Sequence, residues 1–309
     1  MIVTLTVNPA IDRTINVDRL AFEDRAYVNS SRESAGGRGI NASRVIQSFG
    51  GTTLAVLISG GESGKRLESH LSTSGFPIAV VNVRHDIRHN LTITDKQGLT
   101  VNLNEAGPPL SKTEVTRIER VVRQSLGKAD WLMVCGSLPP GVPTTFYARL
   151  IAMARSAKVK TLLDADGDPL REGLEAGPTV VAPNQQEAER LLGRALLTRT
   201  HLLEAAGAIR SMGAESVLLS IGSRGAVGAF ADELLEAIPP RVDALCPIGS
   251  GDALAAAYTW AASRHLSPSE CLRWGVAAGT ASASLPGMNF ATLHQTEEVY
   301  HRVEVRRIG

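Results

Sequence analysis

The segment CPIGSGDALAAA, residues 246–257, decides how this sequence is interpreted. Gly249 and Gly251 flank Ser250, and Asp252 follows them at the start of an alanine-rich run. An aspartate at a helix start is commonly an N-cap. Glycines around a serine can instead turn backbone N–H groups toward an anion, and the helix dipole adds to that attraction. A cap does not need both glycines, so the segment favours an anion site with a carboxylate at its mouth.

Strands and helices alternate along most of the chain around this segment. Buried strands are expected at residues 1–7, 52–59, 130–136, 160–166, 179–184 and 216–222, and helices at 41–49, 144–156, 185–192, 202–212 and 252–262. This order gives right-handed crossovers and a parallel sheet covered on both faces. The predicted fold class is α/β, with a mostly parallel sheet and helices on both of its faces.

Two polar, β-rich stretches interrupt the alternation. TINVDRL (14–20) with AYVNSS (26–31) is one, and RHNLTITDKQGLTVNLNE (88–105) is the other, with a hairpin turn expected at residues 95–98. They predict a half-covered antiparallel sheet that forms a small lid or a dimer surface. No linker divides the chain, so we expect a single domain over residues 1–309, with lid strands from about 13–30 and 86–105.

The composition excludes several classes of protein. The 32 basic and 31 acidic side chains give a net charge of +1, so no global field draws the chain to nucleic acid or to a membrane. The three cysteines form no CxxC pair, which favours a reducing compartment. The N-terminal residues lack the pattern of a signal peptide, and the most apolar helical run is too short to cross a bilayer. A cytoplasmic location is predicted.

Two apparent nucleotide motifs do not fit their surroundings. GESGK (61–65) is similar to a P-loop, but Ser59 stands where the first glycine of that pattern belongs. GRGINA (37–42) satisfies a dinucleotide fingerprint, but SSRESAG before it (30–36) is no buried strand. A turn at Gly36, Gly37 and Gly39 that lets the backbone approach a ligand, followed by a helix N-terminus, is the better interpretation.

Polar residues follow many of the expected strands, where parallel sheets bind ligands. They are Asn8, Asp12, Gly136, Ser137, Asp164, Asp166, Asn184, Ser220 and Gly222. Five motifs in one order then resemble the ribokinase-like sugar kinases, and most closely their phosphofructokinase-B branch, between Val3 and about Ala283. These motifs are GGRGIN (36–41), GSLPPG (136–141), PNQQEAE (183–189), SIGSRGA (220–226) and GSGD (249–252).

The resemblance implies roles for residues at the phosphoryl-transfer end of the site. Asp252 would take the proton from the acceptor hydroxyl, while Gly249, Ser250 and Gly251 form the anion hole. Asn184 and Glu187 would organise Mg²⁺ and the nucleotide phosphates through water. Ser220, Gly222 and Gly225 would lie along the phosphates and ribose of ATP.

The resemblance also implies a set of residues for the sugar and its phosphate. Asp12, Gly36, Gly37 and Asn41 would hold hydroxyl groups, and Ser137 would face the substrate. Arg88 and Asn90 match a phosphate-binding motif, and Arg25 lies where members carry a basic lid residue. Arg38, in the glycine-rich loop, is a further candidate for binding the substrate, as an anion contact. Two positions depart from the pattern: Arg38 and Ala182 each stand where members commonly have lysine, which leaves the effect of Ala182 open.

The predicted function is therefore ATP-dependent phosphorylation of a ketohexose phosphate, by a homodimer that forms through the lid. Fructose 1-phosphate is the expected acceptor, giving fructose 1,6-bisphosphate. Tagatose 6-phosphate and fructose 6-phosphate are the alternatives, because each carries one phosphate and one primary hydroxyl. A sugar-phosphate or nucleotide sensor without catalysis, and a dinucleotide oxidoreductase, are the rival classes.

Overall fold

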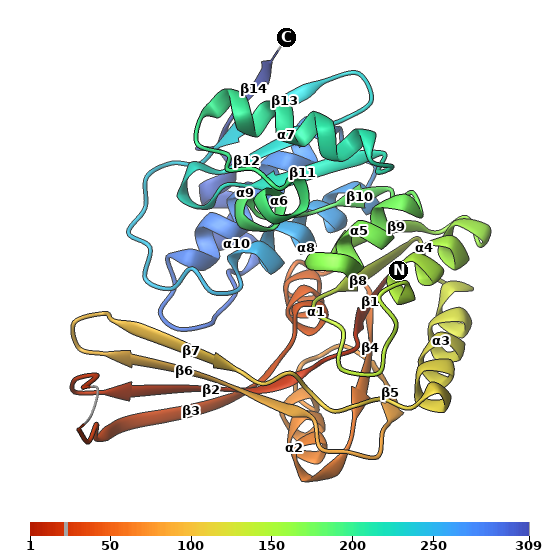
Figure 1. Cartoon of the computed structure of the whole chain (residues 1–309). Coiled ribbons are helices and arrows are strands. Elements are labelled where there is room, and N and C mark those ends of the chain that lie inside the picture. The colour runs from red at the N-terminus through yellow and green to blue at the C-terminus, as the bar shows by residue number, and fades with distance from the viewer. Residues whose placement is uncertain (22–23, 309) are drawn as a thin grey trace.

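The large sheet has ten strands within residues 1–21 and 24–308, which are the residues that the computed structural model describes (Figure 1). In spatial order they are β14 (Glu304–Ile308), β13 (Leu234–Ile238), β12 (Ala226–Ala229), β11 (Ser216–Ser220), β10 (Val180–Val181), β9 (Lys160–Asp164), β8 (Trp131–Cys135), β1 (Ile2–Thr6), β4 (Thr53–Ser59) and β5 (Ile78–Asn82). The strands from β11 to β5 run parallel, and β12, β13 and β14 extend the sheet as an antiparallel edge.

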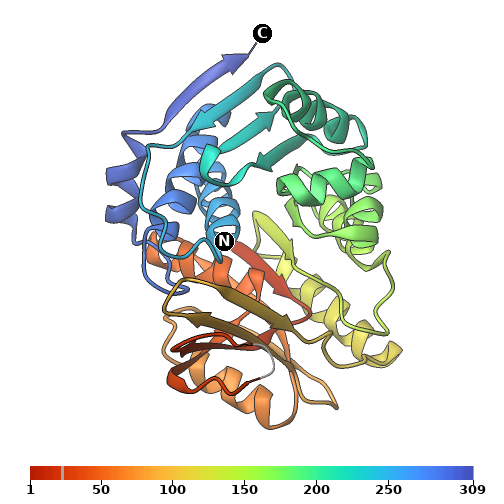
Figure 2. The same ribbon diagram turned by 60° about the vertical axis from the view of Figure 1, so that its left-hand side comes forward.

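Helices cover both faces of this sheet, as the fold class predicts (Figure 2). One face carries α2 (Gly61–Leu71), α3 (Lys112–Leu126), α4 (Phe146–Ser156), α5 (Gly167–Glu175), α6 (Gln185–Leu192) and α7 (Arg199–Ser211). The other face carries α1 (Arg38–Ser48), α8 (Ser250–Ser263), α9 (Pro268–Ala283) and α10 (Leu293–Tyr300). The α/β architecture with a mostly parallel, doubly covered sheet is confirmed.

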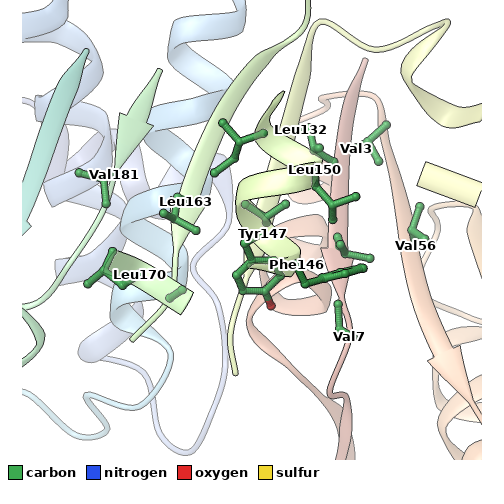
Figure 3. Packing of buried hydrophobic residues seen from close by; sticks show 14 of the residues in the cluster. Val3, Val7, Val56, Leu132, Phe146, Tyr147, Leu150, Leu163, Leu170 and Val181 are labelled. Atoms are coloured by element: carbon green, nitrogen blue, oxygen red, sulfur yellow. The ribbon is translucent and has the colours of Figure 1, made fainter. Parts of the chain in front are cut away.

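The core lies between the sheet and these helices. Every residue of β1 is buried, and β1 pairs in parallel with β4 on one side and β8 on the other. Figure 3 shows Leu150 of α4 near Val3 and Leu132, and Phe146 of the same helix near Val7. Truncating a fully buried aromatic such as Phe146 to alanine costs about 3–5 kcal/mol. This packing holds the ends of the strands in place, and it therefore also positions the polar residues that follow the strands.

The two stretches predicted to form a lid do form a second, separate sheet, which is called the lid below. Its strands, in spatial order, are β3 (Val28–Gly36), β2 (Ala10–Val17), β6 (Arg88–Asp95) and β7 (Thr100–Asn104). The expectation of an antiparallel sheet is wrong for one pair, because β2 and β6 run parallel. Both strands leave the large sheet in the same direction, which makes them parallel (Figure 1). Part of the first predicted lid stretch, residues 22 and 23, lies outside the described residues.

The sequence SSRESAG belongs to β3, an antiparallel and mostly exposed lid strand. GRGINA thus follows a strand, but not a buried strand of the parallel sheet, so the dinucleotide interpretation stays without support. The helix expected at residues 41–49 begins earlier, at Arg38, because Gly37 with φ of 127° serves as its N-cap. No helix within residues 1–21 and 24–308 has both the length and the apolar character that a bilayer crossing requires.

Candidate active site

Asp252 is not the N-cap of its helix. The N-cap is Gly249, with φ of 82°, and Asp252 is the third residue of α8. Its carboxylate oxygen Oδ2 accepts a hydrogen bond of 2.8 Å from Asn41 Nδ2 at the start of α1. The structure therefore excludes the acidic-cap alternative and brings together two residues predicted to act in the site.

The surroundings of Asp252 make it a stronger base than an exposed aspartate. Burial is the largest cause, and the negative charge of Asp164 adds to it, so that the pKa of Asp252 rises to about 7. Arg38 and the Asn41 hydrogen bond oppose this rise in pKa. A base whose pKa lies near neutrality is well matched to taking a proton from a hydroxyl group.

A cavity of about 670 Å³ lies on one side of Asp252. Ser220, Gly222 and Gly225, from the end of β11 and the short 3₁₀ turn η1 (Gly222–Arg224), line it together with Ser250 and Gly251 of α8. The N–H of Ser250 already donates to the Pro247 carbonyl at 3.2 Å. Gly251 is more open, because a side chain there would meet no atom within 4 Å. The predicted nucleotide loop thus shares one cavity with two of the three residues predicted to form the anion hole, Ser250 and Gly251, whereas the third, Gly249, is the N-cap of α8.

A second cavity of about 870 Å³ lies beneath the lid. Five residues predicted to bind the substrate line it: Gly37, Arg38, Arg88, Asn90 and Ser137. Asn8 Oδ1, Arg88 Nε and Asn90 Oδ1 are buried at its wall, and none of them has a hydrogen-bond partner within residues 1–21 and 24–308. Buried polar atoms are normally paired, so these three are suited to a polar ligand.

Asp12 lies at the edge of this second cavity. Its Oδ1 accepts a hydrogen bond of 2.8 Å from Asn90 Nδ2, across paired strands β2 and β6. Gly36 is packed so closely that an added Cβ would lie 2.0 Å from Asp12 Oδ2. Burial raises the pKa of Asp12, while Asn90, Arg88 and Arg44 lower it. Glycine at position 36 therefore leaves room for the Asp12 carboxylate.

Asn184 and Glu187 form a capping box at the start of α6. The Asn184 side chain accepts from the Glu187 N–H, and Glu187 Oε2 accepts from the Asn184 N–H, both at 2.9 Å. Glu187 Oε1 accepts a third hydrogen bond, of 3.0 Å, from Arg38 Nη2. Burial raises the pKa of Glu187, and Arg38 lowers it. The motif is thus a structural cap whose carboxylate also faces the site.

Arg25 lies apart from the other predicted residues. It is exposed and belongs to the connection between β2 and β3 of the lid. Among the residues that the structure describes, Arg25 is not one of those that line either cavity. Its role in phosphate binding remains a prediction.

Three residues of the site had no role assigned from sequence. Asn8 donates to the Ser137 hydroxyl at 3.1 Å, and Asp164 accepts from Arg38 at 2.6 Å. The sequence singled out both as polar residues that follow or end strands of the parallel sheet, but it gave them no role. Arg44 lies near Asp12 and is half-buried, and burial lowers its pKa. No local pattern separates it from a surface arginine.

Comparison with known proteins places this geometry among sugar kinases. The model of the pfkB family carbohydrate kinases matches residues 4–295. The ATP-dependent 6-phosphofructokinase isozyme 2 of Escherichia coli (strain K12) is 30% identical over 302 residues, which is 97% of each chain. The 1-phosphofructokinase of Vibrio cholerae is 25% identical over 304 residues, covering 98% of this chain and 96% of the relative.

A solved structure agrees over the whole fold. The tetrameric inhibited form of phosphofructokinase-2 from Escherichia coli superposes with a TM-score of 0.90 at 30% identity, covering 97% of this chain and 98% of that one. The shared fold therefore includes both the large sheet and the lid.

Proposed function

The chain belongs to the pfkB family of carbohydrate kinases and is a sugar kinase, and on that premise we propose that it phosphorylates a ketohexose phosphate with ATP. The leading acceptor is fructose 1-phosphate, which would give fructose 1,6-bisphosphate. Fructose 6-phosphate and tagatose 6-phosphate are the alternatives. The relative with the higher identity is named for the 6-phosphate reaction and the other for the 1-phosphate reaction, which supports both acceptors.

The observation that carries this proposal is the position of Asp252 between two cavities. Its helix neighbours Ser250 and Gly251 line the cavity suited to a nucleotide. Its hydrogen-bond partner Asn41 belongs to α1, whose first residues line the cavity beneath the lid. A base at this junction can take a proton from a hydroxyl in one cavity while a phosphoryl group arrives from the other.

The proposed reaction uses the chain's own groups in the following way. The acceptor hydroxyl oxygen bonds to the terminal phosphorus of ATP as the bond from that phosphorus to the bridging oxygen breaks, and ADP leaves. The hydroxyl proton passes to Asp252. The open backbone at Gly251 and the positive end of α8 face the negative charge of the group in transfer.

Arg88 is proposed to bind the phosphate that the acceptor already carries. Its Nη1 donates to the Glu105 carbonyl at 3.1 Å, whereas its buried Nε has no hydrogen-bond partner among the described residues. Burial lowers the pKa of Arg88, although Asp12 opposes this effect. A desolvated guanidinium with a free donor gains from an incoming anion, because its fork can bind two phosphate oxygens.

Mg²⁺ is proposed to accompany the nucleotide. Asp164 and Glu187 offer carboxylate oxygens, which are the hard donors that Mg²⁺ prefers, and such sites usually retain several waters. Both oxygens of Glu187 already accept hydrogen bonds, so contact through water fits these residues. When bound, the ion would neutralise phosphate charge during transfer.

The lid is proposed to form a homodimer. Leu91 pairs across from Leu103 and Ile93 from Val101, so four apolar side chains share one face of the lid, and Leu103 is 51% exposed. Tyr27 and Val28 add exposed apolar area. Sedimentation at micromolar concentration should show a dimer or a higher assembly, and Leu103→Asp should shift it toward the monomer. A wild-type monomer would contradict the proposal.

We also propose that the protein works in the cytoplasm, with no nucleic-acid partner and no membrane partner. A net charge of +1 gives no basis for a nucleic-acid partner. Cys135, Cys246 and Cys271 are free thiols, which suits the reducing cytoplasm.

A coupled assay of ADP release tests the proposed function. Fructose 1-phosphate, fructose 6-phosphate and tagatose 6-phosphate are compared with fructose and ribose, with Asp252→Asn as the matched inactive control. We expect at least one ketohexose phosphate to give a kcat/KM more than tenfold above either free sugar. A free sugar as the best acceptor would overturn the assignment of the cavity beneath the lid.

A further inference from the structure

Arg38 crosses the ends of three neighbouring strands of the large sheet. Its side chain passes Gly136, which follows β8, because an added Cβ there would lie 3.8 Å from Arg38 Cγ. Nη1 then lies 2.6 Å from Asp164 Oδ1 at the end of β9. Nη2 lies 3.0 Å from Glu187 Oε1 in the first turn of α6, the helix that follows β10. One guanidinium therefore joins two carboxylates from separate segments.

The two carboxylates depend on this guanidinium for their charge balance. The Asp164 side chain is 9% exposed and that of Glu187 is 3% exposed, while that of Arg38 is 36% exposed. Within the described residues, neither carboxylate forms an ion pair with any other basic side chain. Buried like charges are costly without a paired cation. Asp164 is the largest cause that raises the pKa of Arg38, so the guanidinium stays charged.

Ala182 leaves space for this arrangement. Val180 and Val181 of β10 pair with Leu162 and Leu163 of β9, and the Ala182 N–H still donates to the Leu163 carbonyl at 2.9 Å. Ala182 is thus the register neighbour of Asp164, and the alternation of side chains puts both on the face beneath α1. A long basic side chain at position 182 would compete with Arg38 for Asp164.

We propose that Arg38 is a positioning residue that supplies the cation of this site from α1, and that Ala182 is its small counterpart on β10. In this role Arg38 holds Asp164 and Glu187 beside Asp252 and offsets their charge, rather than binding the acceptor's phosphate. Its kinetic consequences rest on the proposed function. Without Arg38, the carboxylates of Asp164, Glu187 and Asp252 would face the incoming polyphosphate with no protein cation among them. ATP would then bind more weakly, and phosphoryl transfer would be slower.

Five variants test this proposal, and one of them is Ala182→Lys alone. Arg38→Met removes the charge, and Arg38→Lys keeps a charge that cannot hold both carboxylates in a fork. The double variant Arg38→Met with Ala182→Lys moves the cation to β10. Arg190→Met is the matched control, because Arg190 pairs with Asp166, two residues beyond Asp164, and touches neither Asp164 nor Glu187.

We expect Arg38→Met to lower kcat about 30-fold while KM for the sugar phosphate stays within threefold. The kcat of the double variant should be at least fivefold higher than that of Arg38→Met. Ala182→Lys alone should not raise kcat above the wild-type value. The kcat of Arg38→Lys should lie between those of wild type and Arg38→Met. This lysine variant serves as the test if the methionine variant does not fold. A rise in sugar-phosphate KM with kcat preserved, or a double variant no better than Arg38→Met, would overturn the proposal.

A binding measurement separates this proposal from the proposed function, because it needs no acceptor. ATP is titrated calorimetrically in the presence of EDTA, so that no metal ion substitutes for the missing charge. The affinity should fall about tenfold in Arg38→Met, return to within threefold in the double variant and stay unchanged in Arg190→Met. Equal affinity in wild type and Arg38→Met would overturn the role of Arg38 whatever sugar the enzyme uses.

Discussion

Asn41 Nδ2 donates a hydrogen bond of 2.8 Å to Asp252 Oδ2, which joins the start of α1 to the start of α8. The residues are 211 positions apart in the chain. The glycine-rich loop that precedes α1 and the glycines that precede α8 therefore meet at one carboxylate. This contact also lowers the pKa of Asp252, against the larger effect of burial.

Replacing Asn41 with alanine should change the pH dependence of turnover. Without the hydrogen bond, the pKa of Asp252 rises further above its value of about 7, and less of the base is ionised at neutral pH. The acidic limb of the kcat profile should therefore move to higher pH. The control is Asn90→Ala, which removes a similar bond to Asp12 instead. An unchanged acidic limb in Asn41→Ala would separate that limb from Asp252.

Asp252 should also cost the protein stability at alkaline pH. Because burial raises its pKa from 3.8 to about 7 in the folded chain, the folded state loses stability relative to the unfolded chain as the pH rises from about 4 to about 7, and the full cost applies above pH 7. Asp252→Asn should raise the free energy of unfolding at pH 8 by on the order of 2 kcal/mol, and the gain should vanish near pH 4. Calorimetric unfolding at both pH values measures this difference, and an equal change at both would contradict it.

The fold was largely predictable because buried strands and amphipathic helices leave periodic patterns. The helix over residues 185–192 coincides with α6, since its N-cap Asn184 and its C-terminal Gly193 are both visible in the sequence. The parallel pairing of β2 with β6 left no such pattern, because pairing between distant strands is set by the path of the chain. The start of α1 was also missed, because glycine and arginine gave no helical period.

Site residues were predictable where a short motif carried them, as with Asp252 and Asn41. Partners brought together over long distances were not. The bond from Arg38 to Asp164 spans 126 positions, and only the folded sheet makes those residues neighbours. For the same reason, the sequence suggested a free substrate contact for Arg38, whereas the structure gives it two carboxylate partners.

Replacing Arg88 should raise KM for the sugar phosphate but not KM for ATP. Arg88→Met removes the free donor beneath the lid and should raise KM for the sugar phosphate by about 10- to 100-fold, the loss expected for a charge-assisted contact of about 1.5–3 kcal/mol. KM for ATP should stay within twofold. Arg84→Met is the control, since Arg84 is an exposed arginine in the connection between β5 and β6, just before Arg88. Equal effects on both KM values would contradict the assignment.

Gly36→Ala should weaken acceptor binding without unfolding the protein. The new Cβ would lie 2.0 Å from Asp12 Oδ2, so the carboxylate must leave its bond with Asn90. We expect a rise in sugar-phosphate KM on the order of tenfold, the cost of about one polar contact. Gly207→Ala in α7 has nothing within 4 Å and should stabilise the chain by about 0.5–1 kcal/mol. Wild-type KM in Gly36→Ala would mean that Asp12 does not hold the acceptor.

Turnover of Asp252→Asn is the most direct test that Asp252 is the base of a sugar kinase. Acceptor-dependent ADP release is compared with wild type at pH 8, where the wild-type carboxylate is ionised, and calorimetry measures binding of both substrates. We predict a kcat lower by about 10²- to 10⁴-fold with both dissociation constants within threefold, the contribution of a positioned base. A variant that keeps more than a tenth of wild-type turnover would contradict this assignment.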